Sequence, residues 1–303
     1  MGISRRTAAS AALATTGLVS AGLGFLFGET VLARRLIGVT DERPPSPDGV
    51  YGEDLDGDPV TLLVLGDSAA VGYGMKTQAT TPPALLGVGL ARMLDCPVRV
   101  RSVAVVGAES SDLAEQLARG IDAEPDVAVI VIGANDVTHR KSMRAAVADL
   151  QVVVSRLVAD DCDVVVGTCP DLGTVRPIWE PLRSIARLQS RRLAERQTVG
   201  AIEAGARTVS LGSLLGPVFS EHHELMFGED RFHPSASGYA ALAGALLPPL
   251  ADAIREQRSE PRKERPGRAE EVMSVSEAAA EAAQHPGTEV RRVGRWVRVL
   301  RRR

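Results

Sequence analysis

Cysteine is scarce in this sequence, and the scarcity limits the kinds of fold that the chain can form. Three cysteines occur in 303 residues, Cys96, Cys162 and Cys169, which is too few for the framework that stabilises small disulfide-rich domains. Cys162 and Cys169 flank a predicted strand, whose extended chain would hold them roughly 20 Å apart, beyond the reach of a disulfide. No spacing of Cys and His is typical of a zinc site. We therefore predict three ordinary small residues, no metal and no cofactor.

A dominant charge is also missing. The formal net charge is −3, from 35 basic and 38 acidic residues, so the chain lacks the basic bias of nucleic-acid-binding proteins, and we predict no such partner. Lysine occurs only as Lys76, Lys141 and Lys263, and arginine supplies the other basic residues, which is typical of a GC-rich genome rather than of a function. The hydrophobic content of 45% is enough for one sizeable α/β domain with appendages.

Residues 1–40 are predicted to stand outside the fold. Thr7–Gly28 carries no charge and could span a bilayer by length, although Ala, Gly, Ser and Thr keep its hydrophobicity modest. A basic start before an apolar run is also the layout of a secretory signal, and Ser4–Thr7 is weakly similar to a twin-arginine signal. We predict a signal sequence or membrane anchor and an exported domain, in the cell envelope or secreted; a buried core helix is the alternative.

Residues 41–59 are rich in Pro, Gly and Asp, which predicts a linker before a domain over residues 60–257. Within the domain, apolar β-branched runs alternate with helical patterns. The strands are expected at 61–65, 98–105, 126–132, 163–168 and 207–211, and the helices at 83–94, 112–119, 142–159, 181–204 and 235–255. Pro248 and Pro249 should break the last helix near its end. Five strands alternating with helices predict a three-layer α/β/α sandwich around a parallel, doubly wound sheet.

Residues 258–303 differ in composition from the domain. The first part, up to Glu271, is charged and contains prolines, which predicts disorder. The last part carries an apolar stripe at helical spacing, formed by Val293, Trp296, Val297 and Leu300. Seven arginines between Arg291 and Arg303 surround this stripe. The pattern favours a basic amphipathic helix on an anionic membrane, and a solvated basic tail is an equal alternative.

Three short motifs lie at or just beyond the ends of predicted strands, and a fourth opens the last predicted helix. They are Gly66-Asp67-Ser68, Gly107, Gly133-Ala134-Asn135-Asp136 and Asp230-Arg231-Phe232-His233-Pro234. Each motif alone is typical of a turn or a helix cap. The carboxyl ends of parallel strands meet at one edge of a sheet, where α/β proteins bind their ligands. We therefore expect the four motifs to converge there.

The residue types in these motifs make a complete set for acyl transfer. A serine hydroxyl such as that of Ser68 is a poor nucleophile without a base, and His233 is a suitable base. Asp230 is near enough in sequence to hold the other nitrogen of the imidazole. The oxyanion of the transition state needs fixed donors, which the backbone N–H groups of Ser68 and Gly107 and the side-chain amide of Asn135 can supply.

From about Thr61 to Pro249 the chain resembles the SGNH hydrolase superfamily, the GDSL esterases and lipases, because all four motifs occur in the family's order. The resemblance implies a flavodoxin-like sheet, a triad of Ser68, Asp230 and His233, and an oxyanion hole of Ser68, Gly107 and Asn135. One departure is Arg231-Phe232, where small residues such as Gly are frequent, and this bulky pair could narrow the pocket. The absence of a Gly-x-Ser-x-Gly elbow argues against the α/β-hydrolase fold.

These inferences predict a serine esterase or lipase that forms an acyl-enzyme on Ser68 and acts on a small-molecule or lipid ester. An envelope O-acyltransferase with the same site is one alternative, and a catalytically silent binding protein on the hydrolase fold is another. Both termini suggest association with a membrane. The loops at 74–83 and 169–181 are expected to set the acyl-chain specificity.

Four further residues are candidates for roles around the site. His222 and His223 are expected on the surface, with pocket lining or metal binding as the alternative. His139 follows Asn135 closely enough to border the cleft. Trp179 is expected to pack, with a substrate wall or lid as its alternative role. Gly72-Tyr73-Gly74 lacks the Gly-Lys-Ser of a phosphate loop, which argues against nucleotide binding.

Overall fold

The computed structural model describes residues 44–258, 269–273, 280, 288–293 and 296–301. The signal sequence or anchor predicted for residues 1–40, and the disorder predicted for residues 259–268, lie outside the described residues. Among the residues described, no helix is both long enough and apolar enough to cross a bilayer. The three cysteines are free and buried.

The centre of the protein is the parallel sheet that the sequence predicts. In space its strands run in the order β3 (Val98–Ser102), β2 (Val60–Gly66), β4 (Val127–Val131), β5 (Asp163–Gly167) and β6 (Arg207–Val209). All residues of β2 and β4 are buried, as expected for strands covered on both faces. The first strand of the chain to enter this parallel set lies between the second and the third, which is the flavodoxin-like order.

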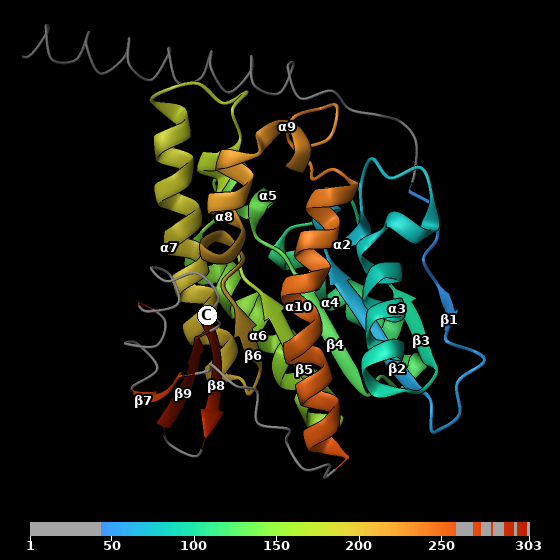
Figure 1. Cartoon of the computed structure of the whole chain (residues 1–303). Coiled ribbons are helices and arrows are strands. Elements are labelled where there is room, and N and C mark those ends of the chain that lie inside the picture. Colours follow the sequence, from blue (N-terminus) through green and yellow to red (C-terminus); the bar gives the residue numbers. More distant parts are fainter. Residues whose placement is uncertain (1–43, 259–268, 274–279, 281–287, 294–295, 302–303) are drawn as a thin grey trace, which may run out of the picture.

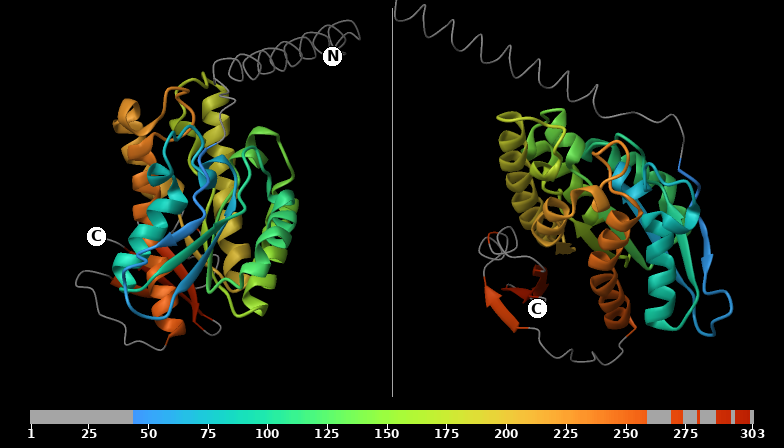
Figure 2. Two further views of the ribbon diagram at one scale, coloured as in Figure 1. Left: turned by 90° about the vertical axis from the view of Figure 1, so that its right-hand side faces the viewer. Right: turned by 45° about the horizontal axis from the view of Figure 1, so that its top comes forward.

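Helices cover both faces of the sheet, so the predicted three-layer sandwich is confirmed (Figures 1 and 2). Along β2, Leu62 and Val64 join one core cluster, while Leu63 and Leu65 join another, because successive strand residues point to opposite faces. The first face packs against α3 (Pro82–Leu94) and α10 (Ala236–Gln257). The second packs against α4 (Leu113–Gly120), α6 (Met143–Ala159) and α7 (Leu182–Glu203).

Several shorter elements complete the carboxyl edge of the sheet. They are α2 (Ser68–Val71), α5 (Ala134–Thr138), α8 (Leu211–Glu221) and α9 (His223–Met226). Single 3₁₀ turns occur at Gln78–Thr80, Ser110–Asp112, Ile121–Ala123 and Leu172–Thr174. The helix predicted at 112–119 begins with one of these turns, at whose start Glu109 forms a capping box with Asp112.

The chain joins the sheet before Val60, within the segment predicted as a linker. Strand β1 (Gly49–Tyr51) pairs antiparallel with β3. The ring of Tyr51 lies over Gly87 of α3, where a Cβ atom would come within 2.5 Å of it. The carboxylate of Asp48 accepts a hydrogen bond from Ser102 N at 2.7 Å. These contacts with residues distant in the sequence hold the segment in the sheet despite its linker-like composition.

The expected break at Pro248 and Pro249 is wrong, because α10 continues through both prolines to Gln257. A proline inside a helix costs about 3 kcal/mol. Leu246, Leu250 and Ile254 on either side are fully or almost fully buried against the sheet. Packing of this face therefore keeps the helix continuous.

The helix predicted at the C-terminus is also wrong, as is the disorder predicted for residues 269–271. Strands β7 (Ala269–Met273), β8 (Thr288–Val293) and β9 (Trp296–Arg301) extend the sheet beyond β6, with β8 antiparallel to β6. The described part of the sheet thus has nine strands, five of them parallel. The segment Val297-Arg298-Val299 alternates β-branched and polar residues, a period of two that fits a strand.

Candidate active site

Ser68 begins a short helix immediately after the carboxyl end of β2. Asp67 caps this helix, and its carboxylate accepts a hydrogen bond from Ala69 N at 2.9 Å. Gly66 permits the turn, since its φ is +138° and a Cβ atom there would lie 2.0 Å from Val131 O. Only glycine fits so close an approach to the neighbouring strand. The Gly-Asp-Ser motif therefore brings the serine hydroxyl to the edge of the sheet.

His233 lies between Ser68 and Asp230. The distance from His233 Nε2 to Ser68 Oγ is 2.9 Å, and that from His233 Nδ1 to Asp230 Oδ2 is 2.5 Å. Asp230 Oδ1 also accepts hydrogen bonds from the backbone N–H groups of Phe232 and His233. Burial opposes ionisation of Asp230, but these bonds outweigh it and lower the pKa of the carboxyl. The three predicted residues thus form one hydrogen-bonded chain.

A tight loop brings His233 and Asp230 into this position. Phe227 and Pro234 form a β-bridge at the base of the loop, and Gly228 N donates to His233 O at 2.8 Å. Arg231 adopts a φ of +55°, a conformation that favours glycine. Its side chain is exposed and lines no part of the cavity, whereas Phe232 does line it. Of the bulky pair, only Phe232 therefore narrows the pocket.

Asn135 and the segment of Gly107 lie side by side at the next strand ends. Gly107 has a φ of +82° and open space around the position of a Cβ atom. Asn135 Nδ2 donates a hydrogen bond to Ala108 O at 2.9 Å. This bond joins α5 to the residue after Gly107, so the segment after β3 contacts the Gly-Ala-Asn-Asp motif. An amide group carries a second hydrogen, which the Ala108 bond does not use.

Two buried carboxyl groups lie close to the serine. Burial raises the pKa of Asp67 to about 6, although N–H bonds from Ala69 and Ala134 and the nearby His233 oppose the rise. Burial likewise raises the pKa of Asp136, whose carboxylate accepts a bond from Ser110 Oγ at 2.9 Å. The negative charge of Asp136 also raises the pKa of Asp67, and that of Glu109 raises the pKa of Asp136, as like charges do.

Two buried glutamines hold the strand ends, and the sequence analysis missed both. Gln116 Oε1 accepts from Gly66 N at 2.8 Å, and Gln116 Nε2 donates to Gly66 O at 2.9 Å. Gln197 Nε2 donates to Ile132 O at 3.1 Å, and its Oε1 accepts from Cys169 N at 2.8 Å. Each amide bonds to backbone groups at or just beyond the carboxyl end of a strand. The available signal was a glutamine within the apolar face of a predicted helix.

A cavity of about 90 Å³ opens beside Ser68 and His233. Its lining is almost entirely apolar, and α8 supplies one wall. The apolar lining includes Val131, Leu172, Val175, Leu211, Leu215, Phe219, Phe227, Phe232 and Leu242. The buried carboxylate of Asp171 also reaches the lining, and it is paired with Arg191 at 3.1 Å and Arg187 at 3.6 Å. These ion pairs offset the cost of burying the Asp171 charge beside an apolar cavity.

The other candidate residues lie around this site. His223 is buried, contrary to the surface position expected, and its ring lies 4.6 Å from that of Phe227 between centroids. Burial and the nearby Arg176 and Arg231 lower the pKa of His223. His139 forms a hydrogen bond with Glu109 at 2.7 Å. Trp179 is 60% exposed, so the expectation that it packs is wrong. The described residues include no cluster suited to a metal ion.

The sequence was then compared with known families and proteins. The model of the GDSL-like Lipase/Acylhydrolase family matches residues 64–241. The chain belongs to this family. It is also 39% identical over 275 residues to the GDSL-like esterase Rv1075c of Mycobacterium tuberculosis, a match that covers 86% of this chain and 87% of the relative. The resemblance inferred from the four motifs is therefore confirmed, and the protein is an ester hydrolase of the GDSL class.

Solved structures with the same fold are more distant in sequence. LAE5, a hydrolase from the metagenome of Lake Arreo, matches with a TM-score of 0.52 at 19% identity, covering 64% of this chain and 96% of that one. The acetylxylan esterase Axe2 from Geobacillus stearothermophilus matches with a TM-score of 0.50 at 21% identity, covering 63% and 94%. At these identities the likeness concerns the fold alone.

Proposed function

We propose that Ser68 is the nucleophile of this esterase, that His233 is its general base, and that Asp230 orients and stabilises the histidine. The observation that carries the proposal is the hydrogen-bonded chain through the three side chains, with 2.9 Å from Ser68 Oγ to His233 Nε2. This distance is within the range that proton transfer requires. A carboxylate on Nδ1 selects the tautomer whose Nε2 accepts a proton.

The proposed reaction has two halves. Ser68 Oγ attacks the ester carbonyl while His233 Nε2 takes the hydroxyl proton, and the same nitrogen then protonates the leaving alcohol. Water next gives a proton to His233 and attacks the acyl-enzyme. Collapse of the second intermediate releases the carboxylic acid and returns the proton to Ser68. Asp230 remains ionised throughout, which its lowered pKa favours.

The oxyanion hole is proposed to consist of Ser68 N, Gly107 N and the side-chain amide of Asn135. The bond from Asn135 to Ala108 supports this role, because it orients the amide before substrate arrives. Preorganised donors of this kind usually supply the largest single contribution to acyl-transfer catalysis. Gly107 has open space beside it, which leaves room for the ester group.

The substrate proposed is a small-molecule or lipid ester with an apolar acyl group. The cavity beside Ser68 supports this class, because its apolar lining rewards burial of hydrocarbon. Phe219, Phe227 and Phe232 bound the cavity, so acyl chains that extend past them should be disfavoured.

Hydrolysis of p-nitrophenyl esters from acetate to palmitate, by the full chain and by Ser68→Ala, tests the mechanism. We expect Ser68→Ala to lower kcat by about three orders of magnitude or more with little loss of stability. Ser142→Ala is the matched control, because this serine only caps α6, and it should retain wild-type rates. A fluorophosphonate probe should label the wild type and not Ser68→Ala.

Full activity in Ser68→Ala would refute the proposed nucleophile. Acyl transfer to an acceptor hydroxyl would share the first half-reaction with hydrolysis. Analysis of products with added sugar or lipid hydroxyls distinguishes the two outcomes, and free carboxylic acid is the product that we expect.

A further inference from the structure

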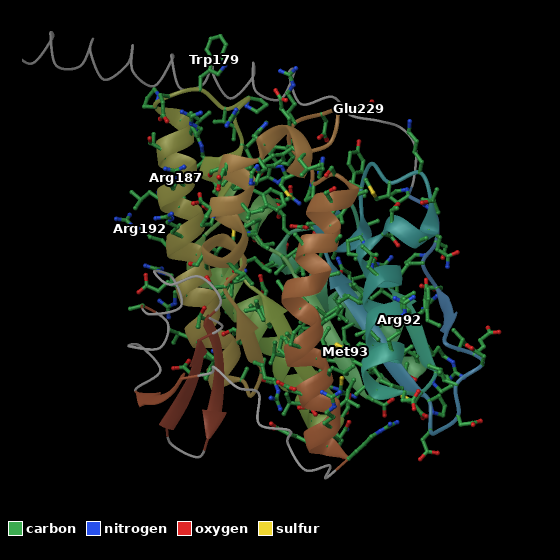
Figure 3. The ribbon with its side chains drawn as sticks, in the orientation of Figure 1. Arg92, Met93, Trp179, Arg187, Arg192 and Glu229 are labelled. Carbon is green, nitrogen blue, oxygen red and sulfur yellow. The ribbon has the colours of Figure 1, made fainter. Side chains whose placement is uncertain are left out.

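The edge of the sheet that carries Ser68 also carries exposed apolar side chains. Trp179 is 60% exposed and Leu225 is 58% exposed. Trp179 lies between the carboxyl end of β5 and the start of α7, at the extremity of the molecule in Figure 3, and Leu225 lies on α9. Val105 and Val106, after β3, are also exposed. Neither Trp179 nor Leu225 lines the cavity, so substrate binding does not explain their exposure.

The described chain also enters the fold at this edge. Because β1 is antiparallel to β3, the residues before Gly49 lie beside the carboxyl end of β3. The bond from Ser102 N to Asp48 places the entry point there. Upstream, Thr7–Gly28 carries no charge. The sixteen residues that follow could span at most about 55 Å, so an anchor formed by Thr7–Gly28 would hold this edge within that distance of a membrane.

The charged side chains around Trp179 and Leu225 show no basic excess. Three are basic and five are acidic: Arg176, Arg183 and Arg231, and Glu180, Glu221, Glu224, Glu229 and Asp230. Glu180 and Arg183 pair with each other at 3.0 Å. Attraction to an anionic surface is therefore weak, and burial of apolar area has to supply the binding free energy. Tryptophan is enriched where apolar lipid tails meet the polar headgroups.

We infer that the carboxyl edge of the sheet lies on a lipid surface, with Trp179 and Leu225 inserted into the interface. The contacts come from separate loops around the cavity and not from one groove, which fits a flat fluid surface better than a folded partner. Leu225 lies two residues before Phe227, which lines the cavity. The cavity then opens toward the lipid and receives its ester from there, a consequence that rests on the proposed function.

Fluorescence quenching tests this orientation directly. The chain has two tryptophans, Trp179 and Trp296, so Trp296→Phe leaves Trp179 as the single reporter. The full-length variant would be reconstituted in phosphatidylcholine vesicles with bromine on the acyl chains. We expect a blue shift and strong quenching of Trp179. The matched control introduces Val152→Trp into a Trp179→Phe, Trp296→Phe background.

Val152 is 64% exposed on α6 and lies about 14 Å along that helix from its first residue, away from the carboxyl edge. A tryptophan there should remain unquenched. Absence of quenching at position 179, or equal quenching at both positions, would overturn the inference. A protein-binding edge would also leave Trp179 unquenched in vesicles of lipid alone.

Kinetics provide a second test that separates docking from catalysis. We expect the double variant Trp179→Ser, Leu225→Ser to hydrolyse a vesicle-borne ester at least tenfold more slowly than wild type, with unchanged hydrolysis of p-nitrophenyl acetate. Val152→Ser should match wild type on both substrates. Equal rates for the double variant and wild type on vesicles would contradict the docking. A different result would contradict the proposed function and not the docking. In that case Trp179 of a protein with Ser68 intact would still be quenched by the vesicles, but the protein would hydrolyse no ester.

Discussion

Two aspartates beside His233 have pKa values that move in opposite directions. Bonds from His233 and from backbone N–H groups lower the pKa of Asp230, whereas burial raises that of Asp67 to about 6. Divergent environments for neighbouring carboxyl groups are a common way to assign them different functions. In the proposed mechanism Asp230 supplies the permanent negative charge, and Asp67 holds backbone N–H groups next to the nucleophile.

Asp230→Asn tests the assignment of the permanent charge. The amide retains the shape of the side chain but favours the wrong histidine tautomer, so kcat should fall by about three to four orders of magnitude. KM should change by no more than a few fold. Steady-state kinetics on a soluble ester measure both values, and a kcat within tenfold of wild type would exclude Asp230 from the triad.

Asp67→Asn tests the raised pKa. Because the folded pKa of about 6 exceeds the ordinary value of 3.8, the folded state binds this proton more tightly than the unfolded state. Its stabilising contribution is present below pH 4 and is lost as the pH rises through 6. The stability of Asp67→Asn relative to wild type should therefore increase between pH 4 and pH 7, by up to about 3 kcal/mol. Denaturant unfolding at both pH values measures it, and parallel profiles would contradict the shift.

Among the elements, α4 and α7 do more than cover the sheet. Each inserts one buried glutamine, Gln116 or Gln197, that bonds to backbone groups at or just beyond the carboxyl end of a strand. Gly66 is held in this way two residues before Ser68. Buried backbone groups without partners are costly, so the packing of α4 helps to hold the backbone that leads to Ser68, the proposed nucleophile.

Gln116→Leu removes both bonds to Gly66 and replaces the amide with an apolar side chain of similar size. We expect a loss of about 2–4 kcal/mol in the free energy of unfolding and a fall in kcat with KM nearly unchanged, because Ser68 is displaced but the cavity is intact. Gln151→Leu is the control, since its amide bonds only to exposed Glu203 at 3.4 Å. Kinetics below the unfolding temperature would show whether kcat falls in folded protein; an unchanged kcat would restrict Gln116 to a structural role.

At the scale of the whole molecule, the C-terminal strands close one side of the sheet. β8 pairs with the short strand β6, and Val290 is fully buried. Without β8 the edge of β6 would be open to other chains. The proposed active site lies at the carboxyl ends of β2 and β4, toward the top of Figure 1, whereas β7–β9 lie at its lower left.

Deletion of residues 258–303 should therefore lower the melting temperature and increase aggregation, while the rate of p-nitrophenyl ester hydrolysis per folded molecule is unchanged. Thermal unfolding with light scattering measures the first effect, and active-site titration measures the second. A deletion variant as stable as the full chain would show that these strands do not contribute to the fold.

The central strands and the site motifs were predictable because their signals are local. A buried parallel strand such as Val127–Val131 reads as a continuous aliphatic run, and Gly66 and His233 belong to short motifs of fixed spacing. The parallel arrangement then requires the strand ends to meet at one edge. No tertiary information is needed for these inferences.

Other features depend on partners that are distant along the chain. The sequence of β1 is typical of a linker, and contacts such as that of Tyr51 with Gly87 make it a strand. The prolines of α10 predict a break, and packing against the sheet keeps the helix continuous. The C-terminal sequence predicts a helix, and pairing with β6 favours strands. The amino-acid order was thus sufficient to identify the family, the site motifs and the parallel core. The borders of the sheet, the position of His223 and the bonds of Gln116 were decided by burial against distant segments. Local sequence propensity does not include the free energy of that burial.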